Sequence, residues 1–118
     1  MYMYFNLSFF VMIIQYNLVI YKMGIYFTDK FSLLHFSTGV IVYYWNISFL
    51  SWFIIHAIFE YTENTHSGMM LLNQFKLWPG GKEKRDTFIN NIGDQFYGSL
   101  GWIFAMFVCN NTSLASLL

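Results

Sequence analysis

The sequence predicts an all-α fold, namely a small polytopic membrane helix bundle with about four short transmembrane helices and an interfacial amphipathic segment. Composition is the first indication, since hydrophobic residues make up 57% of the 118 residues and aromatic residues 23%. Charge is the second, because Asp, Glu, Lys and Arg make up only 10%, whereas a soluble domain carries about 25%. So little surface charge requires lipid or a large partner interface. We expect residues 1–118 to form a single membrane domain.

Net charge excludes one class of function. The chain has six basic and six acidic residues, a formal net charge of zero, and no basic tail. Nucleic-acid binding depends on basic residues that neutralise phosphates, so no nucleic-acid partner is expected. The expected partners are membrane lipid and either a second copy of the chain or a larger membrane assembly.

Four hydrophobic stretches are the expected membrane-spanning helices, at about residues 5–21, 31–44, 47–61 and 87–108. Residues 31–59 contain no Asp, Glu, Lys or Arg, and as one helix they would be about 43 Å long, beyond the roughly 30 Å hydrocarbon core. We therefore place a break at residues 44–48, where Tyr44 and Trp45 suit a membrane interface. One long tilted helix is the alternative.

The basic residues all lie between these stretches, in two loops. With four spans, both loops fall on one side of the membrane, and their Lys and Arg predict that this side is cytoplasmic, with both termini on the outer side. Residues 67–77 are mixed enough for a short amphipathic helix at the interface. Gly80 and Gly81 stand beside cations at the start of a helix, which suits an anion, although an ordinary turn is the alternative. The basic residues are Lys22, Lys30, Lys76, Lys82, Lys84 and Arg85.

Ionisable residues inside the apolar stretches are the candidate functional residues. A charge at such a position is unfavourable in lipid and usually faces a protein interior or a watery cavity. His56 and Glu60 lie four residues apart on one helix face, with Glu63 and Asn64 one turn further. For Glu60, simple hydration near the helix end is the alternative.

The last apolar stretch repeats this pattern. Asp86, Asn90 and Asp94 are spaced four residues apart, although Asp86 also suits a helix N-cap. His35 lies one turn into the second stretch, and these polar groups are expected to converge near the cytoplasmic surface. The candidate ligand-binding residues are His35, Glu60, Glu63, Asn64, Lys82, Arg85, Asp86, Asn90 and Asp94.

The chemistry of this set stays open at the level of the sequence. Histidine with several carboxylates suits a divalent metal, a proton relay or a polar headgroup, and equally a hydrogen-bonded plug that sets helix order. The sequence contains no H-E-x-x-H, G-x-S-x-G or P-loop motif. Spacing therefore assigns no metal ligand, no catalytic residue and no cofactor.

Four short motifs follow one another within about residues 29–105. They are Asp29-Lys30-x-x-x-x-His35, Glu60-x-x-Glu63-Asn64, Pro79-Gly80-Gly81-Lys82 and Asp86-x-x-x-Asn90-x-x-Gly93-Asp94. Together they resemble the VanZ-like family of small integral membrane proteins and related uncharacterised membrane families. The resemblance implies a compact helical membrane domain in which the His, Glu and Asp/Asn positions are drawn together, without an established activity. The gap between His35 and Glu60 is shorter than in the family.

Three functions follow from these observations. The first is a VanZ-like membrane protein that binds a polar or anionic membrane ligand at the His/Glu/Asp cluster. The second is an intramembrane metal-dependent hydrolase acting on lipid. The third is a structural or assembly component of a cellular or viral membrane. Whether the chain is an enzyme is left open by the sequence.

Overall fold

The computed structural model describes residues 23–75 and 81–115, with side chains to residue 110. Its four helices, in chain order, are α2 (Ser32–Tyr44), α3 (Phe49–Glu63), α4 (His66–Gln74) and α5 (Phe88–Ala115), and these described residues contain no strand. The all-α prediction is therefore confirmed for this part of the chain. The helix expected over residues 5–21, together with Lys22, Lys76 and Gly80, lies outside the described residues.

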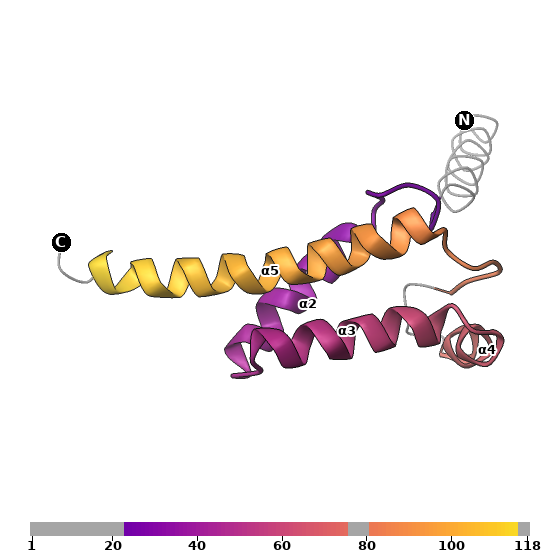
Figure 1. Ribbon diagram of the computed structural model, residues 1–118, viewed down its shortest axis with the longest axis horizontal. Coiled ribbons are helices and arrows are strands. Elements are labelled where there is room, and N and C mark those ends of the chain that lie inside the picture. The colour runs from indigo at the N-terminus through magenta and orange to yellow at the C-terminus, as the bar shows by residue number, and fades with distance from the viewer. Residues whose placement is uncertain (1–22, 76–80, 116–118) are drawn as a thin grey trace, which may run out of the picture.

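Helix α5 is the longest of these helices, and both α2 and α3 pack against it (Figure 1). Helix α3 runs alongside it in the opposite direction, as shown by hydrogen bonds from Trp52 to Gly98 and from Asn64 to Asn91. Helix α2 crosses α5 and makes the most extensive contact with it. Helix α4 packs on the end of α3. One end of α3, the start of α5 and the start of α2 are thereby brought together.

The predicted break between the second and third stretches is confirmed. Helix α2 ends at Tyr44, and Asn46 takes a left-handed backbone conformation with φ of 59°, which a short polar side chain tolerates. The Ser48 side chain then accepts a hydrogen bond from the backbone N–H of Ser51 as the N-cap of α3. The alternative of one long helix is wrong because a left-handed residue and a new cap interrupt the helical hydrogen bonds.

The prediction of a polytopic membrane bundle is wrong for the described residues, because none of their helices is both long and apolar enough to cross a membrane. Helices α2 and α3 contain 13 and 15 residues, so they extend only about 20 Å and 22 Å. Helix α5 has 28 residues, but Asn90, Asp94 and Gln95 interrupt its apolar sequence. The description of the chain as an integral membrane protein with transmembrane helices is corrected accordingly.

The predicted localisation is wrong for the same reason, because no helix of the described residues can cross a membrane. Basic loops on a cytoplasmic side and termini on an outer side presuppose membrane-spanning helices, which the described residues lack. The segment expected as an interfacial amphipathic helix over residues 67–77 does contain a helix, α4, which is capped by Thr65. Its helical structure is confirmed, whereas its placement at a membrane surface rested on the corrected assignment.

The backbones of helices α2 and α5 come into close contact at Gly39 of α2 and Gly101 of α5. An added Cβ at Gly39 would lie 2.1 Å from the backbone oxygen of Gly98, and one at Gly101 would lie 1.9 Å from that of Phe36. Only the missing side chain lets the two backbones come this close. This contact holds His35, one turn before Gly39, against α5.

Substitution of Gly39 by Ala is expected to destabilise the protein by about 2–3 kcal/mol, because the new methyl group meets backbone rather than a movable side chain. Urea unfolding followed by circular dichroism measures the change. The matched control is Gly81→Ala, whose Cβ would meet only the end of the Asn73 side chain, at 3.2 Å. Equal effects of the two substitutions would contradict the close backbone contact.

The interior of the described structure is unusually polar. Its buried apolar residues are Val42, Trp52 and Ala105. Buried polar and charged residues outnumber them, whereas charged residues are almost never fully buried in proteins unless they are paired. A polar cluster, rather than an apolar core, thus occupies the place where α2, α3 and α5 meet. Its buried members are Ser32, His56, Glu60, Glu63, Asn90 and Asp94.

Candidate functional site

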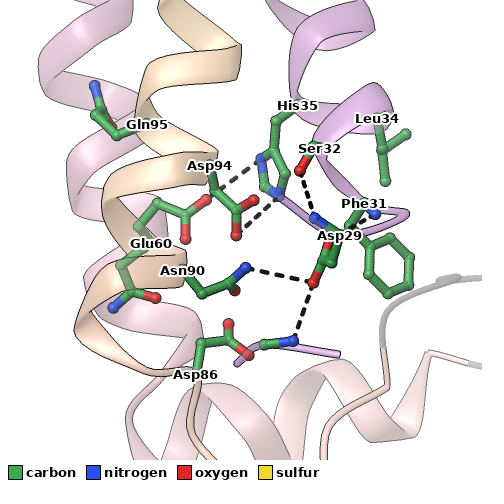
Figure 2. Close-up of polar contacts among 12 residues, drawn as sticks. Asp29, Phe31, Ser32, Leu34, His35, Glu60, Asp86, Asn90, Asp94 and Gln95 are labelled. Carbon is green, nitrogen blue, oxygen red and sulfur yellow. Dashed lines mark hydrogen bonds and ion pairs between the residues drawn. The ribbon is translucent and has the colours of Figure 1, made fainter. Parts of the chain in front are cut away.

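Four ionisable side chains from three helices meet in this interior. His35 comes from α2, His56 and Glu60 from successive turns of α3, and Asp94 from α5. Figure 2 shows the Glu60 and Asp94 carboxylates next to each other and facing the His35 ring. The side chains of Glu60 and Asp94 are only 5% and 4% exposed. We call His35, His56, Glu60 and Asp94 the central cluster.

Three atoms of the central cluster form a nearly equilateral triangle. His35 Nδ1 lies 3.0 Å from His56 Nε2 and 3.3 Å from Glu60 Oε1, and His56 Nε2 lies 3.4 Å from the same oxygen. Ligand atoms about 2.0–2.1 Å from a tetrahedral metal are about 3.3 Å apart. The triangle therefore has the dimensions of three ligands around one divalent ion.

Gln95 on α5 orients one of the two histidines. Its amide Nε2 donates to the Phe53 carbonyl at 3.0 Å, which turns its Oε1 toward His56 Nδ1, also at 3.0 Å. That oxygen can only accept, so His56 carries its proton on Nδ1 and presents a lone pair on Nε2. A hydrogen-bond partner on the distal nitrogen is what metal-ligating histidines almost always have.

Asp94 occupies the corresponding position beside the other histidine. Its Oδ2 lies 3.6 Å from His35 Nε2, on the opposite side of the ring from Nδ1. This distance is longer than a hydrogen bond. Because His56 Nε2 carries a lone pair, His35 Nδ1 is the donor of the 3.0 Å hydrogen bond between the two rings. For His35 Nδ1 to bind a metal ion, its proton would have to move to Nε2, where the Asp94 carboxylate stands ready to accept a hydrogen bond.

Three of the four carboxylate oxygens in the central cluster are buried without a hydrogen-bond donor among the described residues. Neither oxygen of Glu60 nor Oδ1 of Asp94 has a hydrogen-bond partner among the residues that the structure describes. Burial, reinforced by the charge of Glu63, raises the pKa of Glu60 to about 9. Burial likewise raises the pKa of Asp94 to about 7, with Asp29 adding to the effect. A buried carboxylate without a partner is unfavourable, and a bound cation would remove the penalty.

Burial lowers the pKa of the two histidines, the opposite of its effect on the two carboxyl groups. Burial and the neighbouring His56 lower the pKa of His35 to about 4, and burial also lowers the pKa of His56. Both rings are therefore neutral near pH 7, which is the protonation state that binds metal. Without a metal, the two neutral rings give Glu60 no compensating positive charge.

A salt bridge flanks the central cluster. Lys82 contacts Glu63 from α3 and Asp86, which directly precedes α5. Burial opposes the charge of Lys82, but the two carboxylates outweigh it, so the pKa of Lys82 is raised. Burial also raises the pKa of Glu63, although Lys82 counteracts the increase. Lys82 is thus already neutralised by Glu63 and Asp86.

Two asparagines tie the surrounding segments together. Asn64 donates to the Glu60 carbonyl and to Asn91 Oδ1, and its own Oδ1 accepts from the backbone N–H of Asp86. Asn90, 1% exposed, donates to the Tyr26 carbonyl at 2.7 Å, with Asp29 Oδ2 at 3.4 Å (Figure 2). The two asparagines therefore hold the segments around the cluster in place.

A pocket of about 660 Å³ opens onto the cluster and reaches His35 and Asp94. Five of the described lining residues carry a carboxyl group and three carry Lys or Arg, so the lining favours a cation over an anion. Arg85 is exposed and lines this pocket without belonging to the central cluster. The acidic lining residues are Asp29, Glu63, Glu83, Asp86 and Asp94; the basic ones are Lys82, Lys84 and Arg85.

The structure brings most of the predicted site residues together. His35, Glu60 and Asp94 lie in the central cluster, and the remaining residues except Arg85 lie in the salt bridge or the asparagine contacts around it. The set of candidate ligands omitted His56, Gln95 and Asp29. The spacing of His56 to Glu60 was visible in the sequence, whereas no sequence signal pointed to Gln95 or to the contact of Asp29 with Asn90.

Comparison with known proteins gives no match: no family model fits the chain, and no curated protein or solved structure is similar enough to indicate a relationship. The resemblance to the VanZ-like family consequently stays a prediction.

Proposed function

We propose that the protein is a metal-dependent hydrolase that binds one divalent transition-metal ion through His35 Nδ1, His56 Nε2 and Glu60 Oε1. The observation that supports this most directly is the triangle of 3.0, 3.3 and 3.4 Å between these three atoms. Zinc and related ions favour imidazole nitrogen and carboxylate oxygen. Two histidines and one glutamate also form a known type of catalytic zinc site, in which water occupies the fourth position.

The neighbouring pocket supports hydrolysis over a purely structural role. Its lining includes His35 and Asp94 but not His56 or Glu60, so a substrate in the pocket would approach the proposed ion from the side of His35 and Asp94. A bound divalent ion lowers the pKa of water to about 7. The water oxygen would form a bond to an electrophilic carbon or phosphorus, and the bond to the leaving group would break.

Asp94 is suited to carry the proton in this reaction. It lines the pocket, and its Oδ1 has no hydrogen-bond partner within the described residues. The Asp94 carboxylate would accept a proton from the attacking water and return it to the leaving group. A carboxyl with a raised pKa is matched to such an exchange near neutral pH.

The first function expected from the sequence, binding of a polar or anionic membrane ligand, has less support where that ligand is anionic. Its strongest candidate cation, Lys82, is held by Glu63 and Asp86, and carboxyl groups outnumber basic groups in the pocket lining. An anionic substrate therefore depends on the metal ion for its positive charge. Lipid as the substrate is not part of the proposal.

Metal analysis of the purified chain tests the proposal. We expect one Zn²⁺ per chain by calorimetry and elemental analysis, and zinc-dependent cleavage of p-nitrophenyl acetate or bis(p-nitrophenyl) phosphate. His56→Gln should weaken zinc binding by about 100-fold or more, since even second-shell changes weaken metal sites by 10- to 100-fold.

The control is His66→Gln, which alters the exposed histidine at the start of α4, outside the central cluster. It should leave zinc affinity unchanged. If neither Zn²⁺ nor Mn²⁺ binds, or if the two histidine variants behave alike, the proposal is wrong. If one zinc ion binds per chain but neither ester is cleaved, the metal site is supported and the proposed hydrolase activity is wrong.

A further inference from the structure

Part of the buried carboxylate surface would remain unused by the ion proposed at His35, His56 and Glu60. That ion would take Oε1 of Glu60, whereas Oε2 of Glu60 and Oδ1 of Asp94 also lack hydrogen-bond partners among the described residues. Their side chains are 5% and 4% exposed. Two buried oxygens without donors, side by side, indicate that a further cation belongs between them.

A third carboxylate, that of Asp86, lies near those of Glu60 and Asp94, and the three form a second group of candidate metal ligands. Glu60, Asp86 and Asp94 each offer one oxygen, and these three oxygens lie within 4.8 Å of one another. Figure 2 shows Asp86 beyond Asn90, on the same side as Glu60 and Asp94. All three ligand atoms are oxygens, unlike the nitrogen-rich first position. Magnesium and manganese ions prefer such a set.

Lys82 contacts this group of carboxylates at one edge, because its ammonium binds Asp86 and Glu63. Its charge also lowers the pKa of Glu60 and of Asp94, but burial and the neighbouring carboxylates outweigh that effect. The buried oxygens of Glu60 and Asp94 are therefore only partly compensated by Lys82. A second metal ion would therefore share Asp86 with Lys82 or displace it.

We infer that Glu60, Asp86 and Asp94 form a second divalent-cation position of the Mg²⁺ or Mn²⁺ class, with Glu60 bridging the two ions and Lys82 competing for Asp86. Its use as part of a two-metal centre rests on the function proposed above. Two ions about 3.5–4 Å apart stabilise both the attacking and the leaving oxygen in hydrolysis. The second position would thus add positive charge to a pocket in which carboxyl groups outnumber basic groups.

Titration of the zinc-loaded full chain with Mn²⁺ tests this inference. We expect one additional Mn²⁺ per chain by calorimetry, and a change in the manganese electron paramagnetic resonance spectrum on binding. Asp86→Asn should weaken manganese binding about 10-fold or more while zinc binding persists. His66→Gln, which changes an exposed side chain outside both groups and outside the pocket lining, should bind both ions normally.

A second variant, Lys82→Met, tests the inference independently in case Asp86→Asn folds poorly. Removing the competing ammonium should strengthen manganese binding by about 10-fold, a gain that loss of folded protein does not produce. Unchanged manganese binding in both Lys82→Met and Asp86→Asn would overturn the inference.

The two proposals fail in different ways. Zinc binding without any manganese binding overturns the second position and leaves the first intact. Manganese binding to the wild-type and His56→Gln chains, with no zinc binding to either, supports the second position and overturns the first.

Discussion

Glu60→Gln is expected to abolish metal binding and at the same time stabilise the metal-free protein. Glu60 supplies a ligand oxygen to the triangle with His35 and His56, and it belongs to both groups of metal-ligating side chains. A neutral amide is a poor replacement for the carboxylate, so zinc affinity should fall by about 100-fold or more.

The expected gain in stability of Glu60→Gln follows from the burial of the Glu60 carboxyl group. Glu60 has neither oxygen hydrogen-bonded to a described residue, and its pKa is raised to about 9. Glutamine has the shape of the protonated acid without its tendency to ionise. At about pH 8 the variant should be more stable than the metal-free wild type by roughly 1–3 kcal/mol, the usual penalty of a buried polar group without a partner. Urea unfolding in the presence of a chelator measures this difference.

Glu63→Gln is the matched control. Glu63 is also buried and lies one turn further along α3, but its carboxylate pairs with Lys82 instead of contacting the histidines. This variant should keep zinc binding and lose stability, because Lys82 loses a partner. If Glu60→Gln destabilised the protein as Glu63→Gln does, Glu60 would be a satisfied structural residue and the metal site would be wrong.

The second large effect is a stabilisation by zinc that grows as the pH rises. The unfolded chain releases the Glu60 proton near pH 4.5, whereas the folded metal-free protein holds it to about pH 9. The stability associated with this proton is therefore complete below pH 4.5 and is lost as the pH rises through 9. Asp94 acts in the same direction between pH 3.8 and about 7.

His35 acts in the opposite sense at lower pH. Its pKa falls from 6.5 to about 4 on folding, so its contribution is complete above pH 6.5 and is lost as the pH falls through 4. Above pH 7, Glu60 is the only one of these three groups that still changes. The free energy of unfolding of the metal-free protein should thus fall between about pH 7 and 9, by at most about 1.4 kcal/mol per pH unit for one group.

Zinc reverses this loss, because it binds the deprotonated carboxylate and the neutral imidazoles that higher pH favours. The increase in Tm at constant free zinc should therefore become larger from about pH 6 to 9. Thermal unfolding in a zinc-chelate buffer measures it, with Glu60→Gln as the control that shows no increase. A zinc effect that is independent of pH would exclude Glu60 as a ligand.

The sequence by itself determined the helical structure and most of the polar residues that matter. The break before Phe49 follows from local chemistry, since the Ser48 cap and the left-handed Asn46 act within a few residues. The spacing of His56 and Glu60 on one face of α3 follows from the helical period alone. Such features depend on neighbours along the chain, which a sequence displays directly.

The membrane prediction failed because composition does not say how far each helix extends or which face it buries. The apolar excess is real, but among the described residues it is spread over helices that are short, or in α5 interrupted by Asn90 and Asp94. Hydrophobic content averaged over the chain does not distinguish these cases from continuous apolar spans.

Only the tertiary structure decided which polar atoms share a site. His35 and His56 are 21 residues apart, and His56 and Gln95 are 39 apart, so no local pattern relates them. The close backbone contact at Gly39 sets how near α2 lies to α5, and it thereby places His35 beside Asp94. Distances of 3.0 to 3.4 Å between ligand atoms result from helix packing. That packing turns a set of scattered polar residues into a candidate metal centre.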